Sequence, residues 1–281
     1  MDRYLPMTIM TITTLAFTLC VSGTARSQPV PSTREMNLLG WQEFAELVPE
    51  HIETVLIPTG TLEPHGVLPN GSDNLAPKAM AGALAERLDA LIAPPLNYGV
   101  TGRLDGFPGT FSISESAYQS FISEILTGLA KNGFKNLIIV NGHGGPQTAI
   151  LTRAAETVGR RERVRTLVTN WWSMTSEVVF EVFGENGGHA GLNETAYIQA
   201  VVPEHVHPER YSADMATVFP PAGSWSAYPF PSSIGLYEPG QGYPDFDAEK
   251  AKTYYQKVNQ SMAQQIEEII RKWDKAELFK D

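Results

Sequence analysis

The chain alternates between two patterns of apolar residues. Short, largely apolar runs have the length of strands, and they lie at residues 54–58, 90–96, 136–140 and 164–168. Longer segments with apolar residues every three or four positions have the periodicity of helices, and they lie at 36–49, 73–88, 114–133, 147–158, 193–201 and 247–273. Residues 203–244 are rich in Pro, Gly, Ser and aromatic residues, which predicts a long segment with little regular structure.

Residues typical of helix ends stand at several of these boundaries. Asp73 and Asn74 are good N-cap residues for the helix over 73–88, and Asp247 is suited to cap the C-terminal helix. Ser114 or Ser116 can cap the helix that ends at Gly133, where a glycine is well suited to follow the last turn. The boundaries therefore support the helices that the periodicity predicts.

Strands and helices alternate along the chain, and the strands are apolar on both faces. This combination is typical of a mainly parallel sheet that is covered by helices on both sides. Functional sites in such folds lie beyond the carboxyl ends of the strands. The segments after residues 58 and 140 are therefore the first places to search for chemistry.

The first 27 residues have the layout of a secretory signal peptide. A short start with one arginine precedes an apolar, Thr-rich stretch to about residue 21, and small residues follow. The alternative is a membrane anchor, but the stretch is short for a span of about 20 residues. We expect residues 1–27 to be removed, which leaves a single domain over 28–281 that is periplasmic or secreted and free of the membrane.

Composition and charge narrow the functional class. The chain of 281 residues is 42% hydrophobic and carries a formal net charge of −10, so it can bury a core, and its acidity disfavours nucleic acid as a partner. Cys20 is the only cysteine and lies inside the predicted signal peptide. The mature domain therefore has no disulfide, no cysteine nucleophile and no thiolate metal ligand.

Histidines and carboxylates supply the candidate chemistry. Three of the six histidines, His65, His143 and His189, lie beside glycines, which permit sharp turns and the close approach of a ligand. Carboxylates accompany them in the sequence, namely Glu63, Asp73 and Glu194. Imidazole and carboxylate without sulfur form a ligand set for zinc, manganese or iron in a hydrolytic site.

Several motifs in the same order resemble the creatininase (creatinine amidohydrolase) family. The resemblance runs from about Leu56 to Ala200, and its motifs are 58–66 (PTGTLEPHG), 68–73 (LPNGSD), 98–99 (YG), 107–110 (FPGT), 140–145 (VNGHGG) and 189–195 (HAGLNET). It implies a three-layer α/β/α fold, a site with one or two divalent ions, hydrolysis of C–N bonds in small amides, and a homo-oligomer.

The resemblance also implies roles for individual residues. The metal ligands are expected to be Glu63, His65, Asp73 and His143, with Asp73 able to bridge two ions. His189 corresponds to a proton-transfer residue near the substrate. Four further residues are expected to contact the substrate, namely Trp171, Trp172, Gly144 and Gly145. Asp73 as a simple helix cap, and Glu194 as a simple first-turn residue, stay open as alternatives.

Two departures from the family pattern bear on the site. Val67 is followed directly by Leu68 and Pro69, so the second histidine of the usual motif is missing. Gly145 stands where true creatininases carry a glutamate two residues after the histidine. Glu194 can take the place of that ligand, orient His189 or assist catalysis, or the site can hold a single ion.

The sequence therefore predicts an amidohydrolase that cleaves an amide, lactam or formamide bond with a metal-activated water. Zinc is the first choice of metal, with manganese or iron as alternatives. Two other functions stay open, namely an exported lactonase or esterase that uses the same chemistry, and a metal- or ligand-binding protein that has lost its catalysis.

Overall fold

The computed structural model describes Met1, residues 30–221 and residues 223–279. The predicted signal peptide and its cleavage site lie almost entirely outside these residues. Within the described part of the chain, no helix is both long enough and apolar enough to cross a membrane.

Four parallel strands form the central sheet. They are β1 (Thr54–Thr59), β2 (Ala90–Ile92), β3 (Asn136–Asn141) and β4 (Arg165–Asn170). Their order in the sheet is β2-β1-β3-β4, and Thr54 pairs with Asn136 while Asn136 pairs with Arg165. The carboxyl ends of β1, β3 and β4 consequently meet along one edge of the sheet. The predicted parallel sheet is confirmed.

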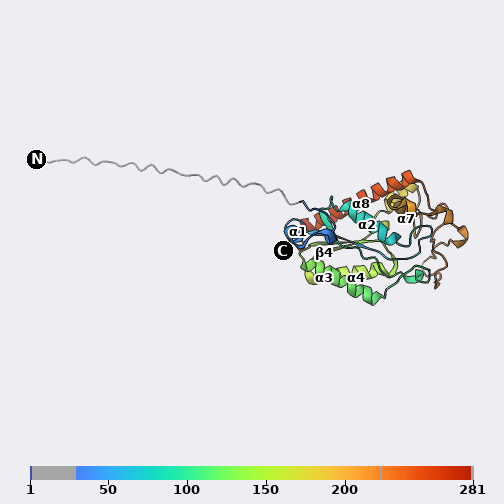
Figure 1. The fold of residues 1–281 in the computed structure, drawn as a ribbon, viewed down its shortest axis with the longest axis horizontal. Helices are drawn as coiled ribbons and strands as arrows, with labels where there is room; N and C mark the ends of the chain where they lie inside the picture. Colours follow the sequence, from blue (N-terminus) through green and yellow to red (C-terminus); the bar gives the residue numbers. More distant parts are fainter. Residues whose placement is uncertain (2–29, 222, 280–281) are drawn as a thin grey trace.

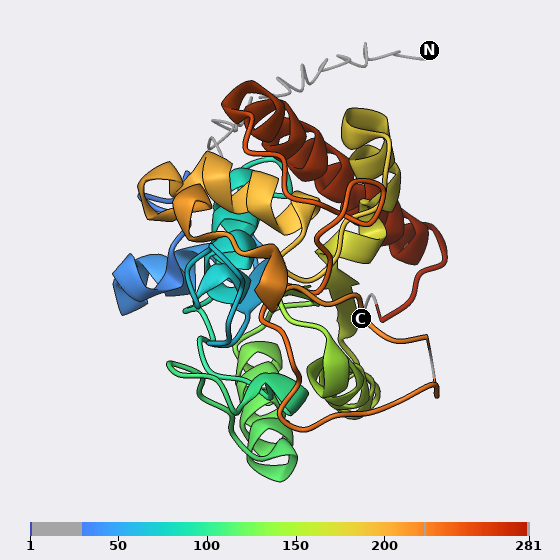
Figure 2. The same cartoon turned by 90° about the vertical axis from the view of Figure 1, so that its right-hand side faces the viewer.

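Helices cover both faces of the sheet, as Figures 1 and 2 show. One face carries α2 (Ser72–Leu84), α7 (Leu192–Val201) and α8 (Ala248–Lys275), together with the short α5 (Trp171–Met174) and α6 (Ser176–Phe183). The other face carries α1 (Trp41–Leu47), α3 (Glu115–Lys131) and α4 (Gly145–Glu162). The three-layer α/β/α architecture is therefore confirmed.

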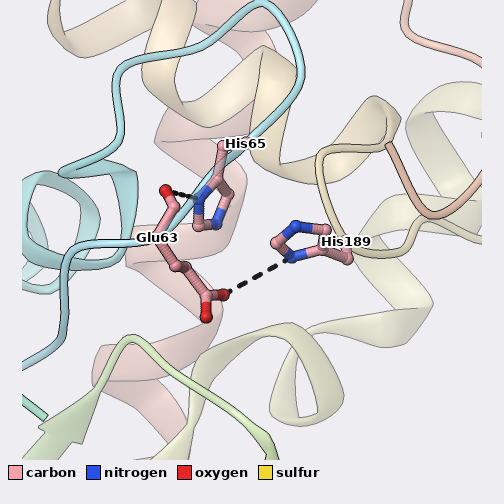
Figure 3. A group of neighbouring side chains, drawn as sticks. All are labelled: Glu63, His65 and His189. Atoms are coloured by element: carbon pink, nitrogen blue, oxygen red, sulfur yellow. Dashed lines mark hydrogen bonds and ion pairs between the residues drawn. The ribbon is translucent and has the colours of Figure 1, made fainter. Parts of the chain in front are cut away.

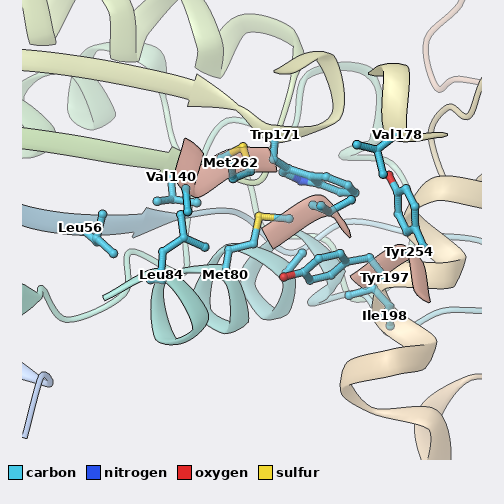
Figure 4. Close-up of a cluster of buried hydrophobic side chains, with 14 of the residues drawn as sticks. Leu56, Met80, Leu84, Val140, Trp171, Val178, Tyr197, Ile198, Tyr254 and Met262 are labelled. Carbon is cyan, nitrogen blue, oxygen red and sulfur yellow. The ribbon is translucent and has the colours of Figure 1, made fainter. Parts of the chain in front are cut away.

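The alternation of side chains along the strands explains why the strands are apolar on both faces. Leu56 and Ile138 point into the core beneath α2, α7 and α8, whereas Val55 and Leu137 point into the core beneath α3 and α4. Figure 4 shows the first of these cores, in which Met80 and Tyr197 are among the packed side chains. Burial of both faces holds the strand ends in fixed positions, which is what a site at that edge requires.

Most helix boundaries agree with the sequence. The Ser114 hydroxyl accepts a hydrogen bond from the Ala117 amide, and the Asp247 carboxylate caps α8. α2 differs, because it begins at Ser72 with Gly71 as N-cap, so Asp73 lies inside the first turn. Five 3₁₀ turns complete the described part of the chain, and three of them fall in the irregular segment 203–244: η1 (Met36–Leu38), η2 (Gly102–Leu104), η3 (Pro203–His205), η4 (Pro208–Arg210) and η5 (Ala213–Met215).

Candidate active site

The candidate residues converge at the carboxyl edge of the sheet. Glu63 and His65 follow β1, and His143 follows β3 by two residues. Asp73 comes from the first turn of α2 and Glu194 from the first turn of α7. The Asn141 side chain fixes the backbone of His143 with two hydrogen bonds. It accepts one from the His143 N–H at 3.2 Å and donates one to the His143 carbonyl at 2.7 Å. Elements far apart in the sequence thus present their polar groups to one point.

Two glycines allow α2 to begin this close to the strand ends. A Cβ atom at Gly60, just after β1, would lie 2.1 Å from the carbonyl oxygen of Asp73. A Cβ atom at Gly142, just after β3, would lie 2.0 Å from the same oxygen. Neither distance is sterically possible, so only glycine at both positions lets the backbone of Asp73 fit between β1 and β3.

Each of the three site histidines is oriented by a main-chain carbonyl. His65 donates Nδ1–H to the Glu63 carbonyl at 3.1 Å, and His143 donates Nε2–H to the Val100 carbonyl at 3.0 Å. His189 donates Nε2–H to the Pro64 carbonyl at 2.8 Å. Because a carbonyl only accepts, each neutral ring must carry its proton on that nitrogen, and the other nitrogen offers a lone pair to the site.

The free nitrogens face carboxylates. Nε2 of His65 is 2.9 Å from Asp73 Oδ1 and 3.6 Å from Glu194 Oε2. Nδ1 of His143 is 2.9 Å from Asp73 Oδ2 and 3.2 Å from Glu63 Oε1. Nδ1 of His189 is 3.7 Å from the same Glu63 oxygen, and Figure 3 shows the Glu63 carboxylate beside the rings of His65 and His189, whose centres are 4.5 Å apart. Asp73 therefore uses both of its oxygens, one toward each of two histidines.

Two buried atoms of this cluster have no hydrogen-bond partner among the described residues. They are Oε2 of Glu63 and Nε2 of His65. The second is close to a carboxylate, yet the geometry is not that of a hydrogen bond. Buried polar atoms are costly without a partner, and a cation between lone pairs would satisfy both. The donor set thus fits a divalent metal ion.

Three overlapping groups of ligand atoms, each within 4.8 Å, occur in the described chain: Glu63 with Asp73 and His143, His65 with Asp73 and Glu194, and Glu63 with His65 and His189. The first two share Asp73, one oxygen of which faces each group. A carboxylate in this position is suited to bridge two ions, which in two-metal sites are about 3.5–4 Å apart.

Burial and charge shift the protonation of the cluster. Burial would lower the pKa of His65, but the Asp73 carboxylate raises that pKa to about 10. Burial also opposes the charge on His143, whose pKa the neighbouring Glu63 and Asp73 nevertheless raise well above its usual value. Without a metal, both imidazoles are therefore protonated at pH 7 and neutralise the surrounding carboxylates.

Two other groups have pKa values that are shifted so as to favour their neutral forms. Burial, supported by the charge on His65, lowers the pKa of His189 to about 3, so this ring is neutral at pH 7. Burial raises the pKa of Glu194 to about 7. Its Oε2 also accepts a hydrogen bond from the Ala190 backbone N–H at 2.7 Å. Glu194 therefore binds a backbone amide just before α7 and also faces His65.

The cluster opens into a cavity of about 650 Å³. Of the residues expected to contact the substrate, Gly144, Gly145 and Trp172 line this cavity. Trp171 does not, because its side chain is 1% exposed and packs against Tyr197 in the core, as Figure 4 shows. Adjacent residues at the start of a short helix point in different directions, and the sequence alone did not distinguish them.

Three further residues line the cavity, namely Arg103, Phe219 and Phe230. Arg103 escaped the sequence analysis, whereas the two phenylalanines belong to the aromatic segment 219–243, whose role the sequence left open. No motif marks them. The aromatic richness of the segment around Phe219 was the one signal available, and it did not indicate which rings face the site.

The space beside Gly145 is open. A Cβ atom at this position would have only Nε2 of His143 within 4 Å, at 4.0 Å, and the backbone φ of 56° is the left-handed conformation that favours glycine. Glu194 instead approaches the cluster from α7, on the side of His65. The carboxylate expected after His143 is thus absent, and a carboxylate from another helix lies within reach of the same cluster.

Comparison with known proteins agrees with this geometry. The creatininase family model, described as creatinine amidohydrolase, matches residues 37–266. A creatinine amidohydrolase from Pseudomonas putida is 27% identical over 202 residues, covering 65% of this chain and 77% of that protein. A mycofactocin precursor peptide peptidase from Mycobacterium ulcerans is 32% identical over 206 residues, or 69% of each chain.

A solved structure of a creatininase variant of Zn-Zn type is also similar. It has 25% sequence identity and a TM-score of 0.71, and the match covers 84% of this chain and 98% of that one. The family match extends over most of the chain, and the clustered imidazoles and carboxylates are those of a metal-dependent hydrolase. This protein therefore belongs to the creatininase family of amidohydrolases.

Proposed function

We propose that this protein hydrolyses a C–N bond, in an amide, lactam or formamide, of a small molecule or short peptide. The single observation that carries the proposal is the convergence of free imidazole nitrogens from His65 and His143 on the two oxygens of Asp73. Relatives that act on creatinine and on a precursor peptide support this class of bond. The size of the cavity leaves room for substrates larger than creatinine.

Two ligand groups that share Asp73 would hold the metal. Glu63 and His143 complete one group, and His65 and Glu194 complete the other. Zinc suits this nitrogen and oxygen donor set, and manganese or iron are alternatives. When bound, a divalent ion would lower the pKa of water and polarise the scissile carbonyl.

His189 is suited to move the proton. Its Nε2 is held by the Pro64 carbonyl, so the unprotonated Nδ1 faces Glu63 and the cavity. Nδ1 can take a proton from the attacking water and pass it to the leaving nitrogen. The low pKa of this ring keeps Nδ1 unprotonated at pH 7, and it makes a proton that reaches Nδ1 easy to release to the leaving nitrogen.

A matched panel of compounds tests this function. Metal-loaded protein is offered amides, lactams, formamides, lactones and esters, and the metal content is measured in parallel. We expect turnover of C–N substrates that is lost with a chelator and restored by zinc or manganese. Turnover of lactones or esters alone would replace the proposal with a lactonase or esterase. Bound metal without any turnover would indicate a binding protein.

The number of metal ions that the site can hold is expected to depend on Glu194. We expect Glu194→Gln to reduce metal content from two ions to one per chain, because the amide is a poor ligand and the group around Glu63 stays intact. Elemental analysis of the purified protein measures this. Glu249→Gln is the matched control, since Glu249 also lies in the first turn of a helix but is exposed. Two ions retained in Glu194→Gln would contradict the assignment.

Metal binding should release protons. His65 and His143 are protonated in the metal-free protein at pH 7 because their pKa values are raised, whereas imidazole binds metal only when neutral. We expect about two protons from the imidazoles to be released on full loading with zinc, together with a further fraction of a proton from Glu194, whose pKa is about 7. Apparent affinity should then rise as pH rises from 6 to 8. Calorimetry in buffers of different ionisation enthalpy gives the number, and a value near zero would show that the imidazoles are already neutral in the metal-free protein or do not bind the metal.

We also propose that the protein acts outside the cytoplasm, in the periplasm or the medium, and as a homo-oligomer. The layout of residues 1–27 supports export. Fractionation of cells that express the full chain tests the location, and N-terminal sequencing of the exported form tests cleavage near residue 27. Light scattering of the purified protein tests the oligomeric state.

A further inference from the structure

Arg103 is the one lysine or arginine among the residues that line the cavity in the described chain. It lies in the short turn η2, which follows the Val100 carbonyl that orients His143. Apart from the site histidines, the other charged groups of the lining are the carboxylates of Glu63, Asp73 and Glu194. The cavity thus has its carboxylates and imidazoles together at the metal-binding end and a single permanent positive charge elsewhere in its wall.

Aromatic rings hold this arginine in place. Its guanidinium carbon is 4.8 Å from the centre of the Phe230 ring and 5.9 Å from that of Phe219. The Phe230 amide also donates a hydrogen bond to the Arg103 carbonyl at 3.2 Å. Phe219 in turn contacts the His189 ring, edge to face, at 6.1 Å. The cation is therefore tied to the same aromatic stack that borders the proton-transfer residue.

Within residues 30–221 and 223–279, no carboxylate lies within ion-pair distance of Arg103. Its guanidinium also donates no hydrogen bond to a described residue, and its side chain is exposed. The rings attract the cation through their π faces, but they do not occupy its N–H donors. A planar guanidinium with free donors matches a carboxylate in a bidentate geometry.

We propose that Arg103 determines specificity by binding a carboxylate of the substrate while the scissile C–N bond lies at the metal end of the cavity. The preferred substrates would then be anionic, such as N-formyl or N-acyl amino acids, carboxylated lactams or the C-terminal end of a short peptide. This inference rests on the proposed C–N hydrolysis and adds the chemical class of the substrate.

The test compares substrate pairs that differ in one carboxylate. N-formylglycine is paired with N-ethylformamide, and 5-oxoproline is paired with 2-pyrrolidone. We expect the wild type to prefer the carboxylated member of a cleaved pair. Arg103→Gln should lose about 10- to 100-fold in kcat/KM for that member, as expected for a hydrogen bond to a charged group, mainly through KM. The neutral member should change less than about threefold.

Two further variants separate specificity from general damage. Arg103→Lys keeps the charge but not the planar donors, so it should recover part of the preference. Arg153→Gln is the matched control, because Arg153 is exposed on α4 and is not part of the cavity lining. Thermal melting of each variant checks that the fold is kept. A preference for the carboxylate that survives in Arg103→Gln, or its absence in the wild type, would overturn the inference.

Failure of the proposed function gives a different result. If the metal-loaded wild type cleaves no member of either pair, C–N hydrolysis of these classes is contradicted. In that case the role of Arg103 is tested by measuring the binding of N-formylglycine and N-ethylformamide with ligand-observed NMR. Metal coordination of the carboxylate is common to wild type and variant, so weaker binding of N-formylglycine to Arg103→Gln supports the inference, and unchanged binding refutes it.

Discussion

Replacing Asp73 with asparagine is expected to remove most of the bound metal and to reduce kcat by at least about 1,000-fold. The two oxygens of Asp73 face His65 and His143, at 2.9 Å each, and the residue belongs to two ligand groups. Asparagine keeps the shape of the side chain but loses its charge and one oxygen. Elemental analysis and turnover on the best substrate of the panel measure the effect.

Two further variants test whether the loss of metal and activity is specific to the carboxylate of Asp73. Asp214→Asn is the control, because Asp214 is exposed in η5 and belongs to none of the ligand groups. His143→Ala should also lose activity, but it leaves the group of His65, Asp73 and Glu194 complete, so it should retain more metal than Asp73→Asn. If Asp73→Asn kept a full complement of metal and full turnover, the shared carboxylate would not be a ligand.

Trp171→Ala should destabilise the fold by about 3–5 kcal/mol, the usual cost of truncating a large buried aromatic residue. Trp171 is 1% exposed and packs among Tyr197, Met262 and their neighbours. Trp172, by contrast, is partly exposed and lines the cavity. Trp172→Ala should therefore change stability by less than about 1.5 kcal/mol while altering KM. Urea unfolding of both variants measures the first quantity, and steady-state kinetics measure the second.

The pair provides its own control, since the two residues are adjacent in the sequence and identical in type. Equal loss of stability in both variants would show that Trp172 is also a core residue. An unchanged KM in Trp172→Ala would remove Trp172 from the substrate site. Either result would contradict the assignment of Trp171 to the core and Trp172 to the cavity.

Much of the fold could be predicted because burial determines it. Val55 and Leu56 enter opposite cores, and only a strand covered on both faces needs apolar residues at consecutive positions. Helix ends were predictable where a side chain makes the cap, as at Ser114 and Asp247. The short helices α5 and α6 were not predicted, because four and eight residues are too few to establish a helical period.

The site was predicted less completely, because its geometry depends on contacts between distant segments. Asp73 had two possible roles in the sequence, as cap or as ligand. The structure assigns the N-cap to Gly71 and turns the carboxylate of Asp73 toward His143. The approach of Glu194 toward His65 depends on how α7 packs, and no spacing along the chain encodes it.

Arg103 shows the same limit more sharply. A single arginine in a turn has no pattern around it, and its relation to the site depends on Phe219 and Phe230, which are more than 100 positions away along the chain. A sequence can thus indicate which residues perform the chemistry more readily than which residues select the substrate.

The two glycines that hold Asp73 have a consequence for engineering this enzyme. Any side chain at Gly60 or Gly142 would collide with the Asp73 backbone, so these positions offer no route to new activity by substitution. Arg103 and Trp172 lie in the cavity wall, and changing them does not disturb the steric fit around that backbone. A library that aims at new substrates should therefore vary the wall of the cavity and leave its base untouched.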